Sequence, residues 1–391
     1  MSTWVVHTAP ITVDYYERAL ADANNWPERD TDIDQSFGSV MAIGAGGYGV
    51  VFRVRNHPPG DPFTTLPGED YALKVFYDTS TAGDALARQE LRAALQFHYA
   101  NELDCARHPH VLCYLGHFRA PFVRFSRQDY LHHEWQRKPV MPDDTYYRCI
   151  VTRFIAAENM LNLVYDDEKR SLVLGSHARP RFDIPVRAFA RLLMTAADGL
   201  RSLHAAGMWH HDIKPANMQT LYYEYEELAE TIIIDLGGAC ARLETCISVT
   251  TPGYAPPVLI LHRYGTPDAE VFAEFCSRDI YALGVSFAQL ARRNEQYFPE
   301  RMQHALRVNY VGVGFIDQLL QEMMHVDWQR RPTAETVMAQ LRRWLGLPAV
   351  EPLARTPRLP SDQLERQRQA EYEEHHNQAL RENRLRRQRE N

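Results

Sequence analysis

The chain has 391 residues, of which 45% are hydrophobic and 24% charged, and its formal net charge is −7. This composition is typical of a globular protein with a sizeable core. The mild acidity gives no support to a nucleic acid or a membrane surface as a partner. No apolar run approaches the ~20 residues that span a bilayer, and the first twenty residues lack the pattern of a signal peptide. We therefore expect a soluble protein.

The cysteines and histidines point to neither a disulfide framework nor a zinc site. The six cysteines form no CxxC pair, and the 17 histidines include three adjacent pairs but no HExxH spacing or zinc pattern. Scattered cysteines favour a reduced, intracellular protein, cytoplasmic or nuclear, with incidental thiols.

The first part of the chain predicts strands with one helix. Residues 1–37 are mixed and polar, so we expect an extension that packs loosely on the body. Short β-branched or aromatic runs predict strands within 40–56, 70–76, 111–118 and 146–155. Residues 82–106 have helical composition, and the polar stretch 119–144 is interpreted as an insertion.

The second part predicts helices. Apolar residues recur at helical intervals over 186–207, 278–293 and 334–347. Strands followed by helices indicate an α+β fold with two lobes. We predict a main domain over 38–346, with a small β-rich N-lobe over about 38–155 and a larger helical C-lobe over about 156–346. The charged tail 347–391 is expected to be disordered or a solvated helix.

A glycine-rich hairpin is the first chemical signal. Gly44, Gly46 and Gly49 stand in a strand–turn–strand pattern, where glycine lets backbone N–H groups approach phosphate oxygens. A dinucleotide-binding motif would continue into a helix, whereas here a strand follows. Lys74, in the apolar run "YALKVF", then offers a point charge for nucleotide phosphates.

Lys74 needs an acid to hold its position, and the sequence leaves that acid open. Counting forward along the predicted helix favours Glu90, and Glu102 is the rival. Counting back from "HPHVL" by about two and a half helical turns lands on Tyr99 instead. An insertion in this segment is implied, but its place is not.

The stretch "HHDIKPANM" carries a catalytic pattern. Asp212 would orient an attacking hydroxyl and accept its proton. Lys214 would neutralise charge on a transferred phosphoryl group, and Asn217 would bind a metal ion through its amide oxygen. Asp235 follows the buried run "TIIID", where Mg²⁺ bridging nucleotide phosphates would give its carboxylate a partner.

These motifs, in this order, resemble the eukaryotic-type protein kinase superfamily over about residues 38–346. "GAGGYGVV" is similar to the family's glycine loop, "YALK" to its lysine strand, "HHDIKPAN" to its catalytic loop and "DLG" to its metal-binding turn. The resemblance implies that Val51 and Ala72 contact the nucleotide beside the glycines, Lys74 and Glu90. It also implies ATP and Mg²⁺ as cofactors.

Later motifs agree with the resemblance. "TPGYAPP" looks like the end of an activation segment, "RDIYALG" places Asp279 where the family braces its catalytic loop, and "DWQRRPTAETV" looks like the family's closing helices. With Lys214 after Asp212, the resemblance implies a serine/threonine kinase acting on protein substrates. A pseudokinase scaffold and a small-molecule phosphotransferase are the rival interpretations. The retained catalytic residues argue against the first, and the protein-substrate motifs against the second.

The sequence also departs from the family pattern. His211 replaces the arginine that receives a loop phosphate, so we predict constitutive activity or activation by a protein partner. Leu236 replaces a phenylalanine, with little damage expected. Val258 replaces the glutamate that normally pairs with a buried arginine, for which Arg331 is the candidate, so Arg331 needs another partner or partial hydration. The acidic stretch "YYEYEELAE", residues 222–230, is interpreted as a solvated loop insertion, with a bias toward basic substrate sequences as the alternative.

Overall fold

The computed structural model describes residues 26, 28, 30, 32–37, 39–45, 49–55, 70–76, 81–100, 108–122, 145–161, 186–223, 228–240, 251–257, 268–292 and 314–350. The chain divides into Met1–Ala354 and Arg355–Asn391, and every described residue lies in the first of these units. The charged tail after Val350 lies outside the described residues. The domain boundaries given above stay predictions.

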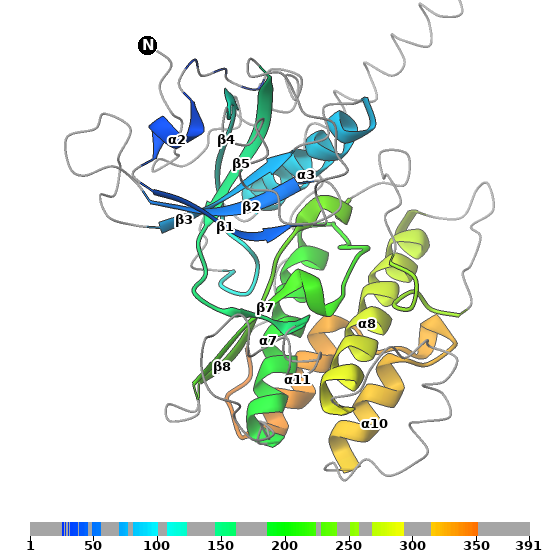
Figure 1. Ribbon diagram of the computed structural model, residues 1–391. Coiled ribbons are helices and arrows are strands. Elements are labelled where there is room, and N and C mark those ends of the chain that lie inside the picture. Colours follow the sequence, from blue (N-terminus) through cyan, green and yellow to red (C-terminus); the bar gives the residue numbers. More distant parts are fainter. Residues whose placement is uncertain are drawn as a thin grey trace, which may run out of the picture. The chain divides into compact units, whose positions relative to one another are not determined.

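A five-stranded antiparallel sheet forms the first part of the fold (Figure 1). The strands are β1 (Ser39–Ala45), β2 (Gly49–Arg55), β3 (Asp70–Phe76), β4 (Tyr114–Pro121) and β5 (Tyr146–Arg153), in the order β1-β2-β3-β5-β4. Burial alternates along β4, as expected for a strand with one face in a core. The helix α3 (Thr81–Ala100) accompanies the sheet.

The register of the sheet brings the predicted nucleotide residues together. Val51 of β2 lies opposite Lys74 of β3, and Ala72 lies opposite Thr152 of β5. A bulge between Ala42 and Gly44 interrupts the β1–β2 ladder just before the glycine-rich turn.

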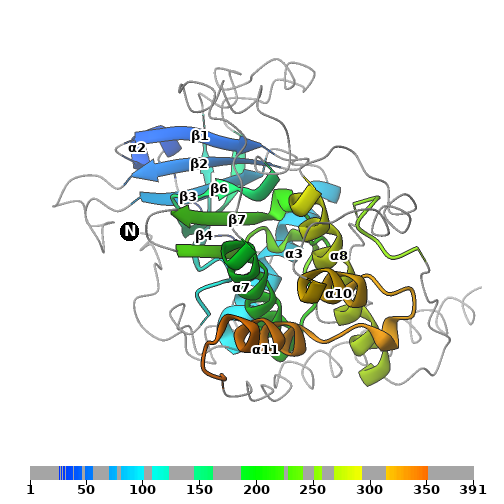
Figure 2. The ribbon, with the colours of Figure 1, turned by 90° about the horizontal axis from the view of Figure 1, so that it is seen from below.

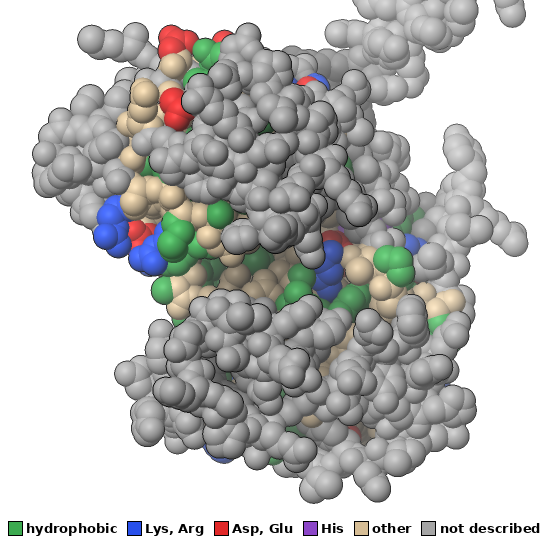
Figure 3. Space-filling view, viewed as in Figure 1, with side chains coloured by type: hydrophobic (Ala, Val, Ile, Leu, Met, Phe, Trp, Pro, Cys, Tyr) green, Lys and Arg blue, Asp and Glu red, His purple; other side chains and the backbone are tan. Residues whose placement is uncertain are grey.

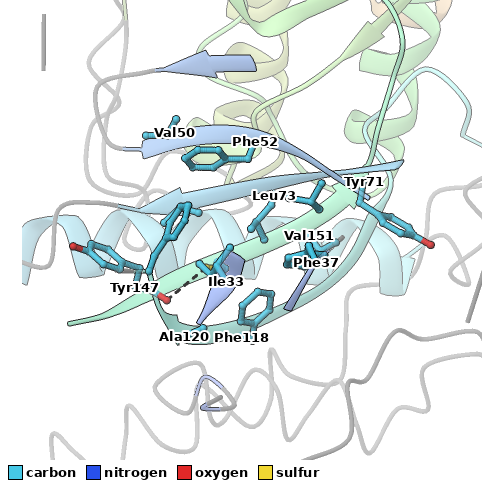
Figure 4. Packing of buried hydrophobic residues seen from close by; sticks show 14 residues of the cluster. Ile33, Phe37, Val50, Phe52, Tyr71, Leu73, Phe118, Ala120, Tyr147 and Val151 are labelled. Atoms are coloured by element: carbon cyan, nitrogen blue, oxygen red, sulfur yellow. Dashed lines mark hydrogen bonds between the residues drawn. The ribbon is translucent and has the colours of Figure 1, made fainter. Parts of the chain in front are cut away.

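One face of this sheet packs into a hydrophobic cluster that includes Phe52, Leu73 and Phe118. Ile33 and Phe37, from the segment around the short helix α2 (Ile33–Ser36), project into the same cluster (Figure 4). Our expectation of loose packing is therefore wrong for this part of the N-terminal extension. Its few large apolar side chains are buried, although the surrounding sequence is polar.

The second part of the fold is helical. It contains α7 (Val186–Ala205), α8 (Asp268–Arg292), α10 (Gly314–Met323) and α11 (Ala334–Leu345), with α7 beside α11 and α8 beside α10 (Figure 2). Thr333 caps the start of α11 by accepting a hydrogen bond from Thr336 N–H, and Gly346 ends it at φ 73°. The predicted α+β class, with strands first and helices second, is confirmed.

Among the residues that the structure describes, this part also contains a small sheet and three short 3₁₀ helices. The sheet pairs β6 (Glu158–Asn159), β7 (Met218–Tyr223) and β8 (Leu228–Ile233) in that order. The 3₁₀ helices are η1 (Pro215–Asn217), η3 (Leu236–Gly238) and η5 (Trp328–Arg330). The interpretation of residues 222–230 as a solvated loop is wrong at both ends of the stretch, because they continue β7 and begin β8. The middle of the stretch lies outside the described residues.

Backbone hydrogen bonds tie the segment after α3 to β8. Ile233 N–H donates to His110 O, and Leu112 N–H donates to Ile233 O, both at 2.9 Å. Gly199 of α7 allows this approach, since a Cβ there would lie 2.5 Å from His110 O. The strand-rich and helical parts are thereby joined behind the predicted site.

Two further predictions concern membranes and thiols. No helix in the described ranges is long and apolar enough to cross a membrane. Cys149 and Cys276 are free thiols, as expected. Cys113 and Cys240, however, are each disulfide-bonded. The expectation of free thiols is therefore wrong for Cys113 and Cys240.

Candidate active site

An ammonium shared by two carboxylates is the centre of the site. Lys74 Nζ donates to Glu90 Oε2 at 2.6 Å and to Asp235 Oδ1 at 2.9 Å. These three residues come from β3, α3 and the turn after β8. The structure thus selects Glu90 as the acid that pairs with Lys74. Glu102, its rival, lies outside the described residues.

The charges of this trio are linked. Burial alone would lower the pKa of Lys74, but Asp235 and Glu90 outweigh it and raise that pKa above its usual range. One ammonium cannot fully compensate two carboxylates, and burial raises the pKa of Glu90 to about 7. Burial would also raise the pKa of Asp235, but the Lys74 charge and a hydrogen bond from Gly237 N–H lower it to about 2. Glu90 is therefore the carboxylate that takes up a proton first.

The turn that carries Asp235 is tightly built. Asp235 adopts a left-handed backbone at φ 60°, and its side chain accepts a hydrogen bond from Gly237 N–H at 3.1 Å. Gln89 of α3 donates to Gly237 O at 3.1 Å. A Cβ at Gly237 would lie 3.0 Å from Asp235 Oδ1 and 3.2 Å from Glu90 Oε2. Glycine at this position therefore lets α3 and the turn meet.

The predicted catalytic loop forms a second polar cluster. Asp212 is 9% exposed and accepts hydrogen bonds from Lys214 Nζ at 2.7 Å and from the Thr251 hydroxyl at 2.7 Å. Asn217 Nδ2 donates to Asp212 O at 2.8 Å and to Asp212 Oδ2 at 3.1 Å. Lys214 Nζ is also 2.8 Å from Thr251 Oγ1. Asp212, Lys214 and Asn217 are thus brought together, and the structure adds Thr251.

Asp279 of α8 holds the backbone of this loop. Its carboxylate accepts from the backbone N–H groups of His210 at 2.7 Å and His211 at 2.8 Å. His204, at the end of α7, lies 3.0 Å from the same carboxylate through Nε2. Burial opposes protonation of His204, yet its contacts with Cys276 and Asp279 outweigh it and raise its pKa to about 10. Our sequence reasoning missed this contact of His204 with Asp279, because nothing in "SLHAAG" marks it.

His211 sits in an apolar setting. Its ring lies 5.4 Å from the ring of Phe275, and within the described residues neither buried ring nitrogen has a hydrogen-bond partner. Burial lowers its pKa, so the ring is neutral at pH 7. Its backbone is left-handed at φ 69°. A neutral imidazole without a polar partner is poorly suited to receive a phosphate.

The glycine-rich turn is only partly described. Gly44 ends the bulge in β1, and Gly49 begins β2. A Cβ at Gly49 would lie 2.6 Å from Val75 O, so this close strand approach needs glycine. Gly46, the third predicted phosphate-binding glycine, lies outside the described residues.

Arg331 has partners other than a carboxylate. Its guanidinium donates to His325 O at 2.7 Å, Val326 O at 3.1 Å, and both Ser277 O and Ser277 Oγ at 3.2 Å. It also lies 5.0 Å from the centre of the Tyr281 ring. Backbone carbonyls thus supply the alternative partner that the sequence required. Val258 lies outside the described residues.

A family comparison agrees with this geometry. Residues 37–341 match the model of the protein kinase domain. The chain belongs to the protein kinase family. The predicted bilobal kinase fold is thereby confirmed.

Curated proteins that are similar to this chain are also named as protein kinases. Serine/threonine-protein kinase H1 of Homo sapiens is 38% identical over 105 residues, which cover 25% of this chain and 22% of that protein. Calcium-dependent protein kinase 9 of Oryza sativa subsp. japonica is 28% identical over 199 residues, 46% of this chain and 31% of that protein. The kinase therefore spans less than a third of the length of either relative.

Proposed function

We propose that this kinase transfers the γ-phosphoryl group of ATP to serine or threonine hydroxyls of protein substrates. The observation that carries the proposal is the pairing of Lys74 with both Glu90 and Asp235, 2.6 and 2.9 Å from its ammonium. A scaffold without catalysis has no need for this arrangement beside an intact Asp212 cluster.

The nucleotide end of the site would use Lys74. Glu90 holds the ammonium at a fixed place, where it can bind nucleotide phosphates as a point charge. On the face seen in Figure 3, Lys and Arg side chains and hydrophobic side chains are both exposed between the sheet and the helices. Charge beside apolar surface suits a ligand that combines phosphates with a base.

The residues present fit a magnesium ion. Lys74 Nζ and Gly237 N–H both donate to Oδ1 of Asp235, so Oδ2 is the oxygen left for a metal. The Asn217 amide donates both of its hydrogen bonds to Asp212 through Nδ2, so its carbonyl oxygen is likewise left for a metal. Mg²⁺ takes oxygen ligands, one or two from protein, and would neutralise charge on the transferred phosphoryl group.

The acceptor end of the site would use Asp212 and Lys214. The Thr251 hydroxyl donates to Asp212 and also lies within hydrogen-bond distance of the Lys214 ammonium. A short aliphatic hydroxyl is thus already held by the pair that would orient a substrate hydroxyl and take its proton. This contact supports serine and threonine as acceptors. The proposal includes an intracellular location, where ATP and Mg²⁺ are available.

Transfer from radiolabelled ATP to a panel of serine, threonine and tyrosine peptides tests the proposal. Wild type should label serine or threonine peptides, and Asp212→Asn should lose at least about 10²-fold of that rate. The variant should still be stabilised against heat by Mg²⁺-ATP, which controls for folding. Equal labelling by wild type and Asp212→Asn would end the proposal, and labelling of tyrosine alone would end its specificity.

A further inference from the structure

Trp26 lies against the sheet on the side that faces α3. Its side chain is 1% exposed, far more buried than its polar surroundings in the sequence suggest. The edge of its ring meets the ring of His117 on β4, with centroids 5.1 Å apart. The guanidinium of Arg148 on β5 lies 5.7 Å from the centre of the indole. Trp26 therefore contacts two strands of the sheet at once.

One path leads from Trp26 to the start of α3. Arg148, under the indole, forms an ion pair with Asp84 in the first turn of that helix. Asp84 is also paired with Arg88, one turn further along, at 3.1 Å. Burial lowers the pKa of Arg148, as expected for a guanidinium held among protein groups. Trp26 thus covers an ion pair that fixes the N-terminal end of α3.

A second path leads from Trp26 to the other end of α3. His117 Nδ1 lies 2.5 Å from the Tyr114 hydroxyl on the same strand. The backbone N–H of Tyr114 donates to His98 Nε2 at 2.7 Å, and His98 belongs to the last turn of α3. The helix is therefore connected to Trp26 near both of its ends.

The position of α3 determines the geometry of the site. Glu90 lies between Asp84 and His98 and holds Lys74, and its neighbour Gln89 holds the turn after Asp235. A shift of α3 would separate Glu90 from Lys74, since an ion pair at 2.6 Å does not survive a displacement of a few ångströms.

We propose that Trp26 is a positioning residue that keeps α3 where Glu90 can hold Lys74. The segment before the sheet would then hold α3 in place, which an activating protein partner would otherwise do. The proposal rests on the proposed function for its kinetic consequences, but the position of α3 can be measured without catalysis. It also gives the predicted constitutive activity a physical basis.

The same segment offers a matched control on the opposite face of the sheet. The backbone of Glu28 bridges to Arg119 on β4, the edge strand, and their side chains pair at 3.0 Å. Beyond this edge, Ile33 and Phe37 enter the cluster on the other face (Figure 4). Truncating Phe37 therefore loosens the sheet without touching the contacts to α3.

The experiment compares Trp26→Ala, Trp26→Phe and Phe37→Ala in the full chain. Within the described residues the buried Nε1 of Trp26 has no hydrogen-bond partner, so Phe keeps the ring contacts and loses no hydrogen bond. We expect Trp26→Ala to speed amide hydrogen exchange in α3 and to lower kcat about tenfold or more, because misplacement of about an ångström can reduce the rate 10²-fold. Trp26→Phe should bring both the exchange rate in α3 and kcat most of the way back to wild type. Phe37→Ala should lower the melting temperature but leave the exchange rate in α3 and kcat close to wild type.

A second set of variants tests the ion-pair path if Trp26→Ala fails to fold. Asp84→Arg and Arg148→Asp should each speed exchange in α3, and the double variant should slow it again. The proposal would be overturned if α3 exchanged at the wild-type rate in Trp26→Ala. It would also be overturned if Trp26→Ala and Phe37→Ala changed exchange in α3 equally. A wild-type chain without kinase activity would instead contradict the proposed function, while the exchange measurements still decide the role of Trp26.

Discussion

Replacing Arg331 by methionine should destabilise the kinase strongly. Arg331 is 7% exposed, and its guanidinium donates to three backbone carbonyls, those of Ser277, His325 and Val326. Burial lowers its pKa to about 10, so it is still charged at neutral pH. Methionine keeps much of the apolar stem but donates no hydrogen bond, so all three carbonyls lose a partner.

The magnitude depends on which carbonyls water can reach. Ser277 O lies within α8 and keeps its intrahelical hydrogen bond, so only the charged hydrogen bond from Arg331 is lost there, and this loss should reduce the free energy of unfolding by about 1.5–3 kcal/mol. Val326 is 47% exposed, and water can replace the lost bonds in its turn at a smaller loss. We expect Arg331→Met to lower the free energy of unfolding by about 2–4 kcal/mol in total. The free energy of unfolding of Arg331→Lys should lie between those of wild type and Arg331→Met, because an ammonium reaches fewer of these acceptors.

Urea unfolding of the full chain, followed by tryptophan fluorescence, measures this difference. Arg330→Met is the matched control, since the neighbouring side chain is exposed. It should remain within about 0.5 kcal/mol of wild type. The melting temperature of Arg331→Met should fall by roughly 3–6 °C. If Arg331→Met and Arg330→Met unfold at the same urea concentration, the carbonyl contacts do not stabilise the buried guanidinium as we argue.

Two further predictions concern the site and its activation. Because the pKa of Glu90 is raised to about 7 in the folded chain, the folded state binds a proton that the unfolded state has lost. The free energy of unfolding should therefore decline as pH rises from about 4.5 to 7, and Glu90→Gln should remove that decline. If the free energy of unfolding changes with pH equally in wild type and Glu90→Gln over this range, the assignment is contradicted. Thr245, Ser248 and Thr250 directly precede the "TPGYAPP" motif in the sequence. Their joint replacement by alanine should leave turnover close to wild type in the peptide assay, since the neutral ring of His211 is poorly suited to bind a phosphate. A collapse in rate would refute this.

The sequence predicted the elements whose patterns are local. The strand around Lys74 and the helix α7 follow directly from alternation and from helical spacing of apolar residues. The catalytic loop was also predictable, because Asp212, Lys214 and Asn217 lie within six residues of one another and their chemistry fits one reaction. Such features depend on neighbours along the chain.

Features that depend on distant contacts were not predictable. Counting residues could not choose the acid for Lys74, since the choice depends on where α3 packs rather than on its length. The partners of Arg331 were hidden because backbone carbonyls have no signature in the sequence. Trp26 was missed for a similar reason: one buried indole in a polar stretch has no periodicity, and only the contacts with β4 and β5 show its role.

The histidine at position 211, a departure from the family pattern, bears on how the kinase is activated. A buried arginine at position 211 would carry a charge that needs an anion, and a phosphorylated loop would supply it. A neutral histidine brings no such charge, so Asp279 can hold the backbone of the catalytic loop without a phosphate. Control over the Lys74–Glu90 pair then passes to whatever holds α3. We propose that Trp26 holds α3, and on that proposal regulation of the kinase should act by displacing Trp26 rather than by modifying the activation loop.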